Sequence, residues 1–506
     1  MTALWYIPEP RCVFGYGQSM EHPKDGLTAF GPVHDHRQPK TLRVGAIGTP
    51  DGLRYLRQWV ASIQGAVPVS REGDPKQSMF PGFEATFKCS WSEQPVASLA
   101  IDPKDIDEAL RHADGHQRIY NTVGLYQSQI ARYVTEEDYP VDMWFVVIPE
   151  SVYERGRPKS TVPMAERTNQ DEALSRKQAQ TLASEPYFAF LEEVNKSAEM
   201  HRYARDFRDQ LKGRLLASRA VIQVVRETTL APHAFTRPNG APARMLQDPV
   251  DIAWNLATGA FYKGGGQPWR LDGIRHGVCY LGMVYKKLDE RSGSQACCGA
   301  QMFLSDGDGL VFKGAVGDWY SDETREYHLD EAHAEALIRK AIAGYHSQHG
   351  EAPKEIFIHG RARFNDAEWA GFQAGVPEGT ALVGVRIKRN GLRKLYRDDR
   401  YTSLRGMAMP FSERMGLLWT LGFVPRLQTY QGREVPNPLL IDICRGDADL
   451  RTVMTDVLAL TKVNFNACLY ADGMPVTLRF ADRVGRVLTA IPPELDPPPL
   501  PFRHYI

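Results

Sequence analysis

One stretch decides the fold: Gly277-Val278-Cys279-Tyr280-Leu281-Gly282-Met283-Val284-Tyr285, which carries no charged side chain. Continuous apolar runs of this length are typical of strands buried on both faces of a sheet. Two further strands are predicted at residues 300–304 and 310–316. The segment between them, Ser305-Asp306-Gly307-Asp308-Gly309, favours a turn, so these two strands are expected to pair as a hairpin.

The residues after this hairpin continue the pattern in a known order. A helix is predicted at 330–345, where the apolar side chains recur on one face. A strand at 356–359, a helix at 366–374 and a strand at 382–387 follow. Three strands, a helix, a strand, a helix and another strand is the order of a ribonuclease-H-like domain.

The chemistry of a ribonuclease-H-like nuclease is not supported by these strands. Such an enzyme needs carboxylates that converge on two Mg²⁺ ions, one from the first strand and one after the fourth. The first strand has no acidic residue, and the fourth runs into Gly360-Arg361-Ala362-Arg363, which is cationic. Asp482 could be one surviving ligand. A divergent nuclease that uses Asp482 with Asp306 and Asp308 therefore stays open as an alternative.

The first half of the chain alternates strands and helices. Strands are predicted at 42–48 and 143–148, and helices after Thr49-Pro50, at 106–112 and at 123–134. This alternation predicts a Rossmann-like α/β domain. We therefore expect an extended leader at 1–40, a first domain at 41–270 with a polar insertion near 151–200, and a second domain at 271–506.

Four polar residues near the end of the first domain form a candidate phosphate site. Arg208 and Lys212 are four residues apart and share one helix face. Gln223 interrupts an apolar strand pattern, and Lys263 ends a helix pattern before three glycines. Each could have an ordinary role, since a last-turn lysine stabilises a helix dipole and paired cations are often solvated. Their order and spacing together favour a shared anion site.

A second cationic region follows the last predicted strand of the ribonuclease-H-like order. Residues 386–405 hold eight basic and two acidic side chains, with Tyr396 and Tyr401 among them. Such a run can be a solvated face, but in a chain with 61 basic and 61 acidic residues it is a candidate contact for a nucleic-acid backbone. The contacts we expect are from Arg386, Lys388, Arg389, Arg393 and Lys394.

Composition excludes several classes of protein. The balanced charge offers no general attraction to nucleic acid or membrane, so a polyanion site has to be local. Seven cysteines without a Cys-x-x-Cys pair argue against a disulfide framework and against a zinc site. No apolar stretch approaches membrane-spanning length and no signal peptide is evident, so we expect a cytoplasmic protein without a membrane partner.

With these features in hand, the whole chain resembles the short prokaryotic Argonautes, which consist of a MID domain and a PIWI domain. In that family the guide 5′ phosphate is held by an aromatic, His or Arg residue, a lysine four residues later, a glutamine and a second lysine. Arg208, Lys212, Gln223 and Lys263 match those positions in order. Segments at 25–32, 79–84, 460–466 and 475–482 are also similar to family segments.

The resemblance implies a binding protein and not a slicer. Val284 and Arg361 stand where slicing members have catalytic aspartates, so an inactive PIWI domain is expected. The family implies a 5′-phosphorylated guide RNA and a single-stranded DNA target. It also implies a separate APAZ-containing partner with a TIR NADase, DREN-type nuclease or sirtuin-like effector, which acts in abortive infection and can assemble further on activation.

Two more sites come from the resemblance. The family tucks an apolar C-terminal residue into the phosphate pocket, which implies that the Ile506 carboxylate shares a Mg²⁺ ion with the guide phosphate. Lys462, in the segment 460–466, is counted with the backbone contacts. A generic single-strand binder remains a third possibility beside the guide-binding subunit and the divergent nuclease.

Overall fold

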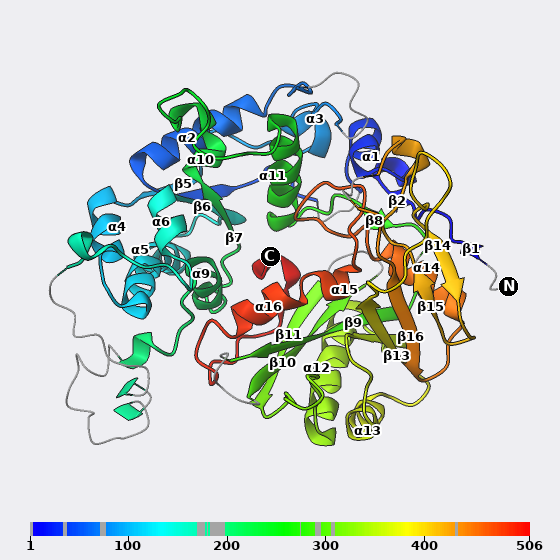
Figure 1. The fold of residues 1–506 in the computed structure, drawn as a ribbon. Helices are drawn as coiled ribbons and strands as arrows, with labels where there is room; N and C mark the ends of the chain where they lie inside the picture. Colours follow the sequence, from blue (N-terminus) through cyan, green and yellow to red (C-terminus); the bar gives the residue numbers. More distant parts are fainter. Residues whose placement is uncertain are drawn as a thin grey trace.

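The computed structural model (Figure 1) contains two large β-sheets with helices on their faces and one small sheet. The predicted loop with Asp306 and Asp308, and part of the predicted insertion near 151–200, lie outside the described residues. The residues that the structure describes are 4–33, 38–70, 77–168, 178–179, 181–182, 198–273, 275–288, 295–304, 309–430 and 434–506.

The first sheet is four-stranded and entirely parallel. Its order is β5 (Ala97–Ala100), β4 (Val44–Gly48), β6 (Met143–Ile148) and β7 (Ile222–Arg226). The helices that connect and cover it are α2 (Pro50–Ser62), α3 (Phe83–Phe87), α4 (Pro103–Leu110), α5 (Gly115–Glu136), α6 (Glu150–Arg155), α9 (Phe207–Leu215), α10 (Glu227–Leu230) and α11 (Pro249–Lys263). The Rossmann-like architecture predicted from the sequence is confirmed.

Helices cover both faces of this parallel sheet. Helices α4, α5 and α9 bury their apolar side chains in one cluster with Trp144 and Val146 of β6. Helices α2 and α11 cluster instead with Phe145 and Val147. Because successive side chains of a strand point to opposite faces, the uninterrupted apolar run of β6 serves two cores at once.

The second sheet has ten strands. Their order is β1 (Trp5–Tyr6), β14 (Met407–Pro410), β15 (Met415–Leu418), β16 (Leu439–Arg445), β13 (Ala381–Arg389), β12 (Glu355–Gly360), β9 (Val278–Lys287), β10 (Ala296–Phe303), β11 (Gly309–Gly317) and β17 (Leu500–Pro501). Strands β9, β10 and β11 pair antiparallel, whereas β12 lies parallel to β9 and β13. The five predicted strands therefore form a ribonuclease-H-like centre.

Two helix layers enclose this centre. Helices α12 (Glu331–His349) and α13 (Asp366–Gly375) cluster with Leu281 and Met283 of β9. The opposite face of β9 meets α14 (Leu450–Ala459), α15 (Val476–Arg479) and α16 (Ala481–Leu488). Gly282 is required at this contact, because a Cβ atom there would lie 1.9 Å from the backbone oxygen of Thr477.

The predicted extended leader holds more structure than expected. It forms helix α1 (Pro23–Phe30) and strands β2 (Cys12–Val13) and β3 (Ser19–Met20), and β2 also pairs with β8 (Arg270–Leu271). Its first strand, β1, joins the ten-stranded sheet. Figure 1 shows the other end of the chain at the centre of the molecule, near α9, α11 and α16. Within the described ranges, no helix combines the length and apolar character that crossing a bilayer requires.

Candidate functional site

The structure brings the predicted phosphate-site residues together from three elements. Lys212 lies on α9, Gln223 on β7 and Lys263 in the last turn of α11. The Lys263 ammonium donates a hydrogen bond of 2.5 Å to Oε1 of Gln223. The Lys212 ammonium donates to the backbone oxygens of Ile222, at 3.2 Å, and His504, at 3.3 Å. The charge of Arg208 also acts on both lysines, and we call Arg208, Lys212, Gln223 and Lys263 the anion pocket.

Both ammonium groups in the anion pocket are buried among other cations. Lys212 and Lys263 are each 2% exposed. Burial lowers the pKa of Lys212 well below its ordinary value, and Lys263 and Arg208 lower it further, while Asp209 acts in the opposite direction. Burial followed by Arg208 and Arg483 lowers the pKa of Lys263 in the same way. An anion placed here would relieve this repulsion.

Arg208 has a direct acidic partner, whereas the two lysines have none among the described residues. Within the described part of the chain, no carboxylate forms an ion pair with Lys212 or Lys263. The Arg208 guanidinium is partly exposed and donates to Oδ1 of Asp209 at 2.9 Å. A buried cation without a counterion is costly, so the arrangement favours binding of an anion that the chain does not supply.

The last residues of the chain form one wall beside Lys212. They make the short helix η6 (Phe502–His504), and Tyr505 and Ile506 are 1% and 2% exposed. The ring nitrogens of His504 lie 3.0 Å and 3.1 Å from two backbone oxygens. Burial lowers the pKa of His504 to about 4, so the ring is neutral at pH 7 and adds no charge. The tail is ordered against the pocket instead of extending into solvent.

Comparisons with known proteins agree with this architecture. By sequence, neither a protein-family model nor a curated protein matches the chain. By structure, it matches Clostridium butyricum Argonaute bound to a guide DNA (5′ deoxycytidine) and a 19-mer target DNA, with a TM-score of 0.59 and 14% identity. It also matches A. aeolicus Argonaute, with a TM-score of 0.53 and 14% identity. Each match covers 97% of this chain and 54% of the solved chain, so this chain spans about half of their length.

The chain has an Argonaute-like fold. The parallel four-stranded unit is its MID domain, and the ribonuclease-H-like unit is its PIWI domain. The anion pocket is formed by MID elements, and the tail from the PIWI side of the chain contacts it through the backbone oxygen of His504.

Sequence reasoning missed one cation of the site. Arg483 lies in the first turn of the PIWI helix α16, and its charge acts on both Lys212 and Lys263. Burial lowers the pKa of Arg483 itself, and Arg208 lowers it next. The position lies far from the MID residues in the sequence, so only the fold reveals the proximity.

A chain of ion pairs runs from the anion pocket into the PIWI domain. Asp209 contacts Arg208 with one carboxylate oxygen and Nε of Arg486, at 3.3 Å, with the other. Nε of Arg486 also lies 3.7 Å from Asp482, whose other oxygen accepts from Nζ of Lys286 at 2.8 Å. We call this series the ionic chain.

The ionic chain includes Asp482, which the sequence analysis considered as a surviving ligand of a catalytic centre. Burial alone would raise the pKa of Asp482, but Lys286 and Arg486 lower it below its ordinary value. Val284 lies two residues before Lys286 on β9, is 1% exposed and faces the same part of α16 near Gly485. Arg361 is exposed directly after β12. Among the described residues, no group of three or more His, Cys, Asp or Glu side chains is placed to hold a metal ion.

The residues predicted to contact a nucleic-acid backbone include exposed side chains and side chains that lie close to a carboxylate. Lys388, Arg389 and Arg393 are exposed at the end of β13 and just beyond it. Arg386 contacts Asp442 at 3.2 Å. Lys394 lies 3.8 Å from Glu434.

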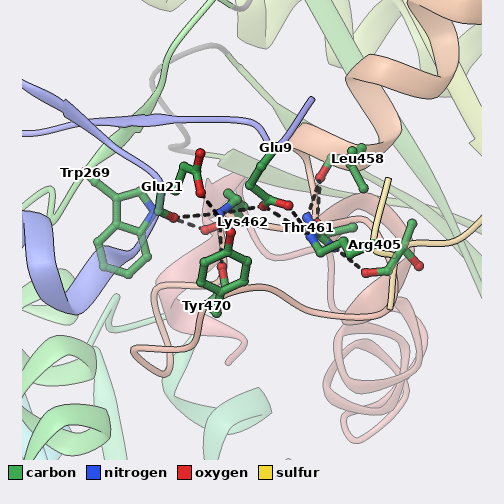
Figure 2. Close-up of polar contacts among 9 residues, drawn as sticks. Glu9, Glu21, Trp269, Arg405, Leu458, Thr461, Lys462 and Tyr470 are labelled. Carbon is green, nitrogen blue, oxygen red and sulfur yellow. Dashed lines mark hydrogen bonds and ion pairs between the residues drawn. The ribbon is translucent and has the colours of Figure 1, made fainter. Parts of the chain in front are cut away.

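Lys462 lies in the interior of the protein, so it is not one of the exposed side chains available to a nucleic-acid backbone. Figure 2 shows its ammonium among Glu9, the backbone oxygen of Glu21 and the ring of Tyr470. The ion pair with Glu9 is 2.7 Å long, and the Lys462 side chain is 0% exposed. Arg405, from the cationic run, also contacts Glu9 at 2.8 Å. The sequence did not indicate this burial, because the partner carboxylate, Glu9, comes from the opposite end of the chain. Lys462 is therefore left out of the proposed contacts with a nucleic-acid backbone.

Proposed function

We propose that the chain is the guide-binding subunit of a prokaryotic immune system and anchors a 5′-phosphorylated guide RNA in the anion pocket. The supporting observation is the pair of buried lysines that have lowered pKa values and no carboxylate partner in the described residues. A terminal phosphate carries close to two negative charges and three acceptor oxygens. It would provide the counterion that both ammonium groups lack.

Each residue of the anion pocket would contribute in its own way. Lys212 and Lys263 would donate charge-assisted hydrogen bonds, which are shorter and stronger than neutral ones. Gln223 positions Lys263 through its Oε1 and donates from Nε2 to the Val224 backbone oxygen. An amide nitrogen carries two hydrogens, so one donor remains for the phosphate. Arg208 would reach the phosphate from its partly exposed position.

We also propose that Mg²⁺ binds here only together with the guide. The chain's contribution would be the carboxylate of Ile506, since Asp209, the acid whose charge acts on Lys212, is already paired with Arg208 and Arg486. Mg²⁺ prefers oxygen ligands and often bridges a carboxylate and a phosphate. The ion would therefore offset repulsion between two anions and orient the tail.

The PIWI domain is proposed to recognise a complementary single-stranded DNA without cutting it. Val284 and Arg361 do not supply carboxylates, and Lys286 neutralises Asp482. Sequence would be read by base pairing while the protein holds the backbone. We propose that target binding activates an APAZ-containing effector partner in the cytoplasm, which carries the enzymatic activity and can assemble further.

One set of measurements tests this proposal with the purified chain. Affinity is compared for the same RNA guide with a 5′ phosphate and with a 5′ hydroxyl, and we expect at least tenfold tighter binding of the phosphorylated guide. Guide-loaded protein is then incubated with labelled complementary DNA and Mg²⁺ or Mn²⁺, and we expect stable binding with an intact target. Equal affinities would favour a generic single-strand binder. Guide-dependent cleavage that is lost in Asp482→Asn would favour the divergent nuclease.

A further inference from the structure

A cavity of about 340 Å³ lies at the carboxyl end of the parallel sheet in the MID domain. Its lining includes residues that come just after each of the four strands, which are Thr49 after β4, Pro103 after β5, Pro149 after β6 and Glu227 after β7. The strand order is β5-β4-β6-β7, so the chain leaves β4 toward one edge of the sheet and leaves β6 toward the other. Ligands of open α/β sheets bind preferentially where the strand order reverses in this way.

This cavity is separate from the anion pocket. The two sites lie at opposite ends of β7, because Lys212 contacts the backbone oxygen of Ile222, the first residue of that strand, whereas Glu227 follows its last residue. No residue of the anion pocket lines the cavity. A ligand bound here would therefore be a second ligand of the MID domain, and its binding does not depend on the proposed guide anchoring.

Glu227 brings a buried carboxylate without a counterion to this cavity. Its side chain is 7% exposed, and its Oε1 accepts a hydrogen bond of 2.6 Å from the Thr49 hydroxyl. Among the described residues, Oε2 has no hydrogen-bond partner and neither oxygen forms an ion pair with a cation. Burial raises the pKa of Glu227, the hydrogen bond from Thr49 lowers it, and the charge of Asp51 raises it again. Because a buried charge without a partner is costly, a ligand that donates hydrogen bonds to Oε2 would be stabilised here.

The charged side chains that line the cavity are all acidic. Asp51 and Asp107 join Glu227, and none of the described lining residues is Lys, Arg or His. Asp51 pairs with Arg54 at 2.9 Å, but both side chains are exposed, and such surface pairs contribute little. Asp107 forms no ion pair among the described residues. The cavity therefore favours a cation over an anion.

The backbone around the cavity also disfavours a phosphate ligand. Helix N-termini at strand ends commonly hold phosphates through their free N–H groups. Here α2 and α4 each begin with a proline, which has no N–H. The N–H of Gly52 donates to Oγ1 of Thr49 at 2.9 Å, and the N–H of Lys104 donates to Oδ1 of Asp102 at 2.9 Å. The two N-termini therefore offer few donors to a phosphate, while the carboxylates nearby offer acceptors.

We propose that this cavity binds a small aliphatic polyamine, which places one ammonium group at Oε2 of Glu227 and another at the Asp107 carboxylate. An ammonium group carries hydrogen-bond donors and no acceptor, which suits a carboxylate oxygen that lacks a partner. Within the described ranges, no three acids lie close enough together to share one metal ion, so a flexible chain with separated charges fits better than a single cation. The methylene groups between the charges would lie against Ile106 and the proline rings of the lining.

The test measures binding of spermidine to the full chain without nucleic acid, by calorimetry and by thermal unfolding in about 0.15 M salt, which screens weak surface attraction. The wild type should show saturable binding and a melting temperature that rises with spermidine concentration. Glu227→Gln should bind about 10-fold more weakly or worse, as expected for loss of a charge-assisted hydrogen bond. Asp107→Asn should bind more weakly by a smaller factor, because Asp107 is exposed. Asp138→Asn, at an exposed position outside the cavity, should bind like the wild type.

The outcomes separate this inference from the proposed function. Glu227→Gln should fold, because the amide oxygen can still accept from Thr49, and it should keep the wild-type preference for a 5′-phosphorylated guide. If it does not fold, Asp107→Asn alone decides. A wild type that binds spermidine but shows no 5′-phosphate preference contradicts the proposed function only. The inference is overturned if the wild type shows no saturable binding, if a folded Glu227→Gln or Asp107→Asn protein binds spermidine as tightly as the wild type, or if Mg²⁺ at the same concentration gives the same Glu227-dependent stabilisation.

Discussion

Replacing Lys212 or Lys263 by methionine should remove most of the preference for a phosphorylated guide. Methionine fills much of the same volume without a charge. Each lysine is expected to donate one charge-assisted hydrogen bond, which contributes about 1.5 to 3 kcal/mol. This range corresponds to about 10- to 150-fold weaker binding for each substitution. Because both side chains are only 2% exposed, we expect values in the upper half of the range.

The same substitutions should leave the nucleic-acid-free protein at least as stable as the wild type. In the free protein each ammonium is desolvated and repelled by neighbouring cations, which is why both pKa values lie well below the ordinary one. Lys212→Met loses hydrogen bonds to two backbone oxygens, each of which contributes about 1 kcal/mol. Removing a buried cation that has no carboxylate partner among the described residues offsets that loss.

The assay is equilibrium binding of matched guides with a 5′ phosphate or a 5′ hydroxyl to the wild type and to each variant. The ratio of the two affinities should fall toward one in Lys212→Met and Lys263→Met. It should stay at the wild-type value in Lys104→Met, an exposed position of α4. An unchanged ratio in both pocket variants would refute the reasoning. So would an equal loss of both guides together with a loss of thermal stability, which would indicate a folding defect.

Four further predictions concern proton uptake, the pH dependence of stability, a buried charge and a close backbone contact. The pKa values of Lys212 and Lys263 are lowered in the free protein, and a bound phosphate should raise these pKa values. Guide binding at alkaline pH should therefore be accompanied by proton uptake. Calorimetry in two buffers of different ionisation enthalpy measures this uptake. Lysines of the unfolded chain titrate near pH 10.5, so between the lowered pKa values and pH 10.5 the unfolded chain binds more protons than the folded protein without guide. The free energy of unfolding should therefore rise with pH across this range. Glu9→Gln should destabilise the protein to denaturant by about 3 to 5 kcal/mol, because it leaves two buried cations without their carboxylate, whereas the exposed Glu93→Gln should have little effect. Gly282→Ala should cost about 3 kcal/mol or more in the same measurement, because its Cβ would meet a backbone oxygen at 1.9 Å.

The strands that sequence predicts correctly are those with strong apolar patterns. β6 and β9 are continuous apolar runs covered by helices on both faces, so composition alone indicates them. Strands β14 and β15 escaped prediction because each is four residues long and follows the charged run. Helix α1 was missed because it contains Gly26, a weak helix former that here allows the Phe14 ring to approach.

The site residues of the first domain and the C-terminal tail were predicted, whereas the contacts from α16 were not. Lys212, Gln223 and Lys263 lie on neighbouring MID elements, so order and spacing indicate their proximity. Arg483 and the ionic chain depend on how α16 meets α9, which no local pattern encodes. The error at Lys462 has the same cause, since a buried ion pair between distant segments looks like a surface charge in the sequence.

The ten-stranded sheet is bounded by the two ends of the chain. β1, at residues 5–6, pairs with β14, and β17, at residues 500–501, pairs with β11 at the opposite side of the sheet. During synthesis on the ribosome, β1 can therefore pair only after β14 has emerged, and β11 keeps an open edge until residues 500–501 have emerged. Unpaired edges invite pairing with other chains, and long-range pairings form slowly. The PIWI sheet should thus be completed only once residues 500–501 have emerged, and until then the nascent chain is prone to aggregate.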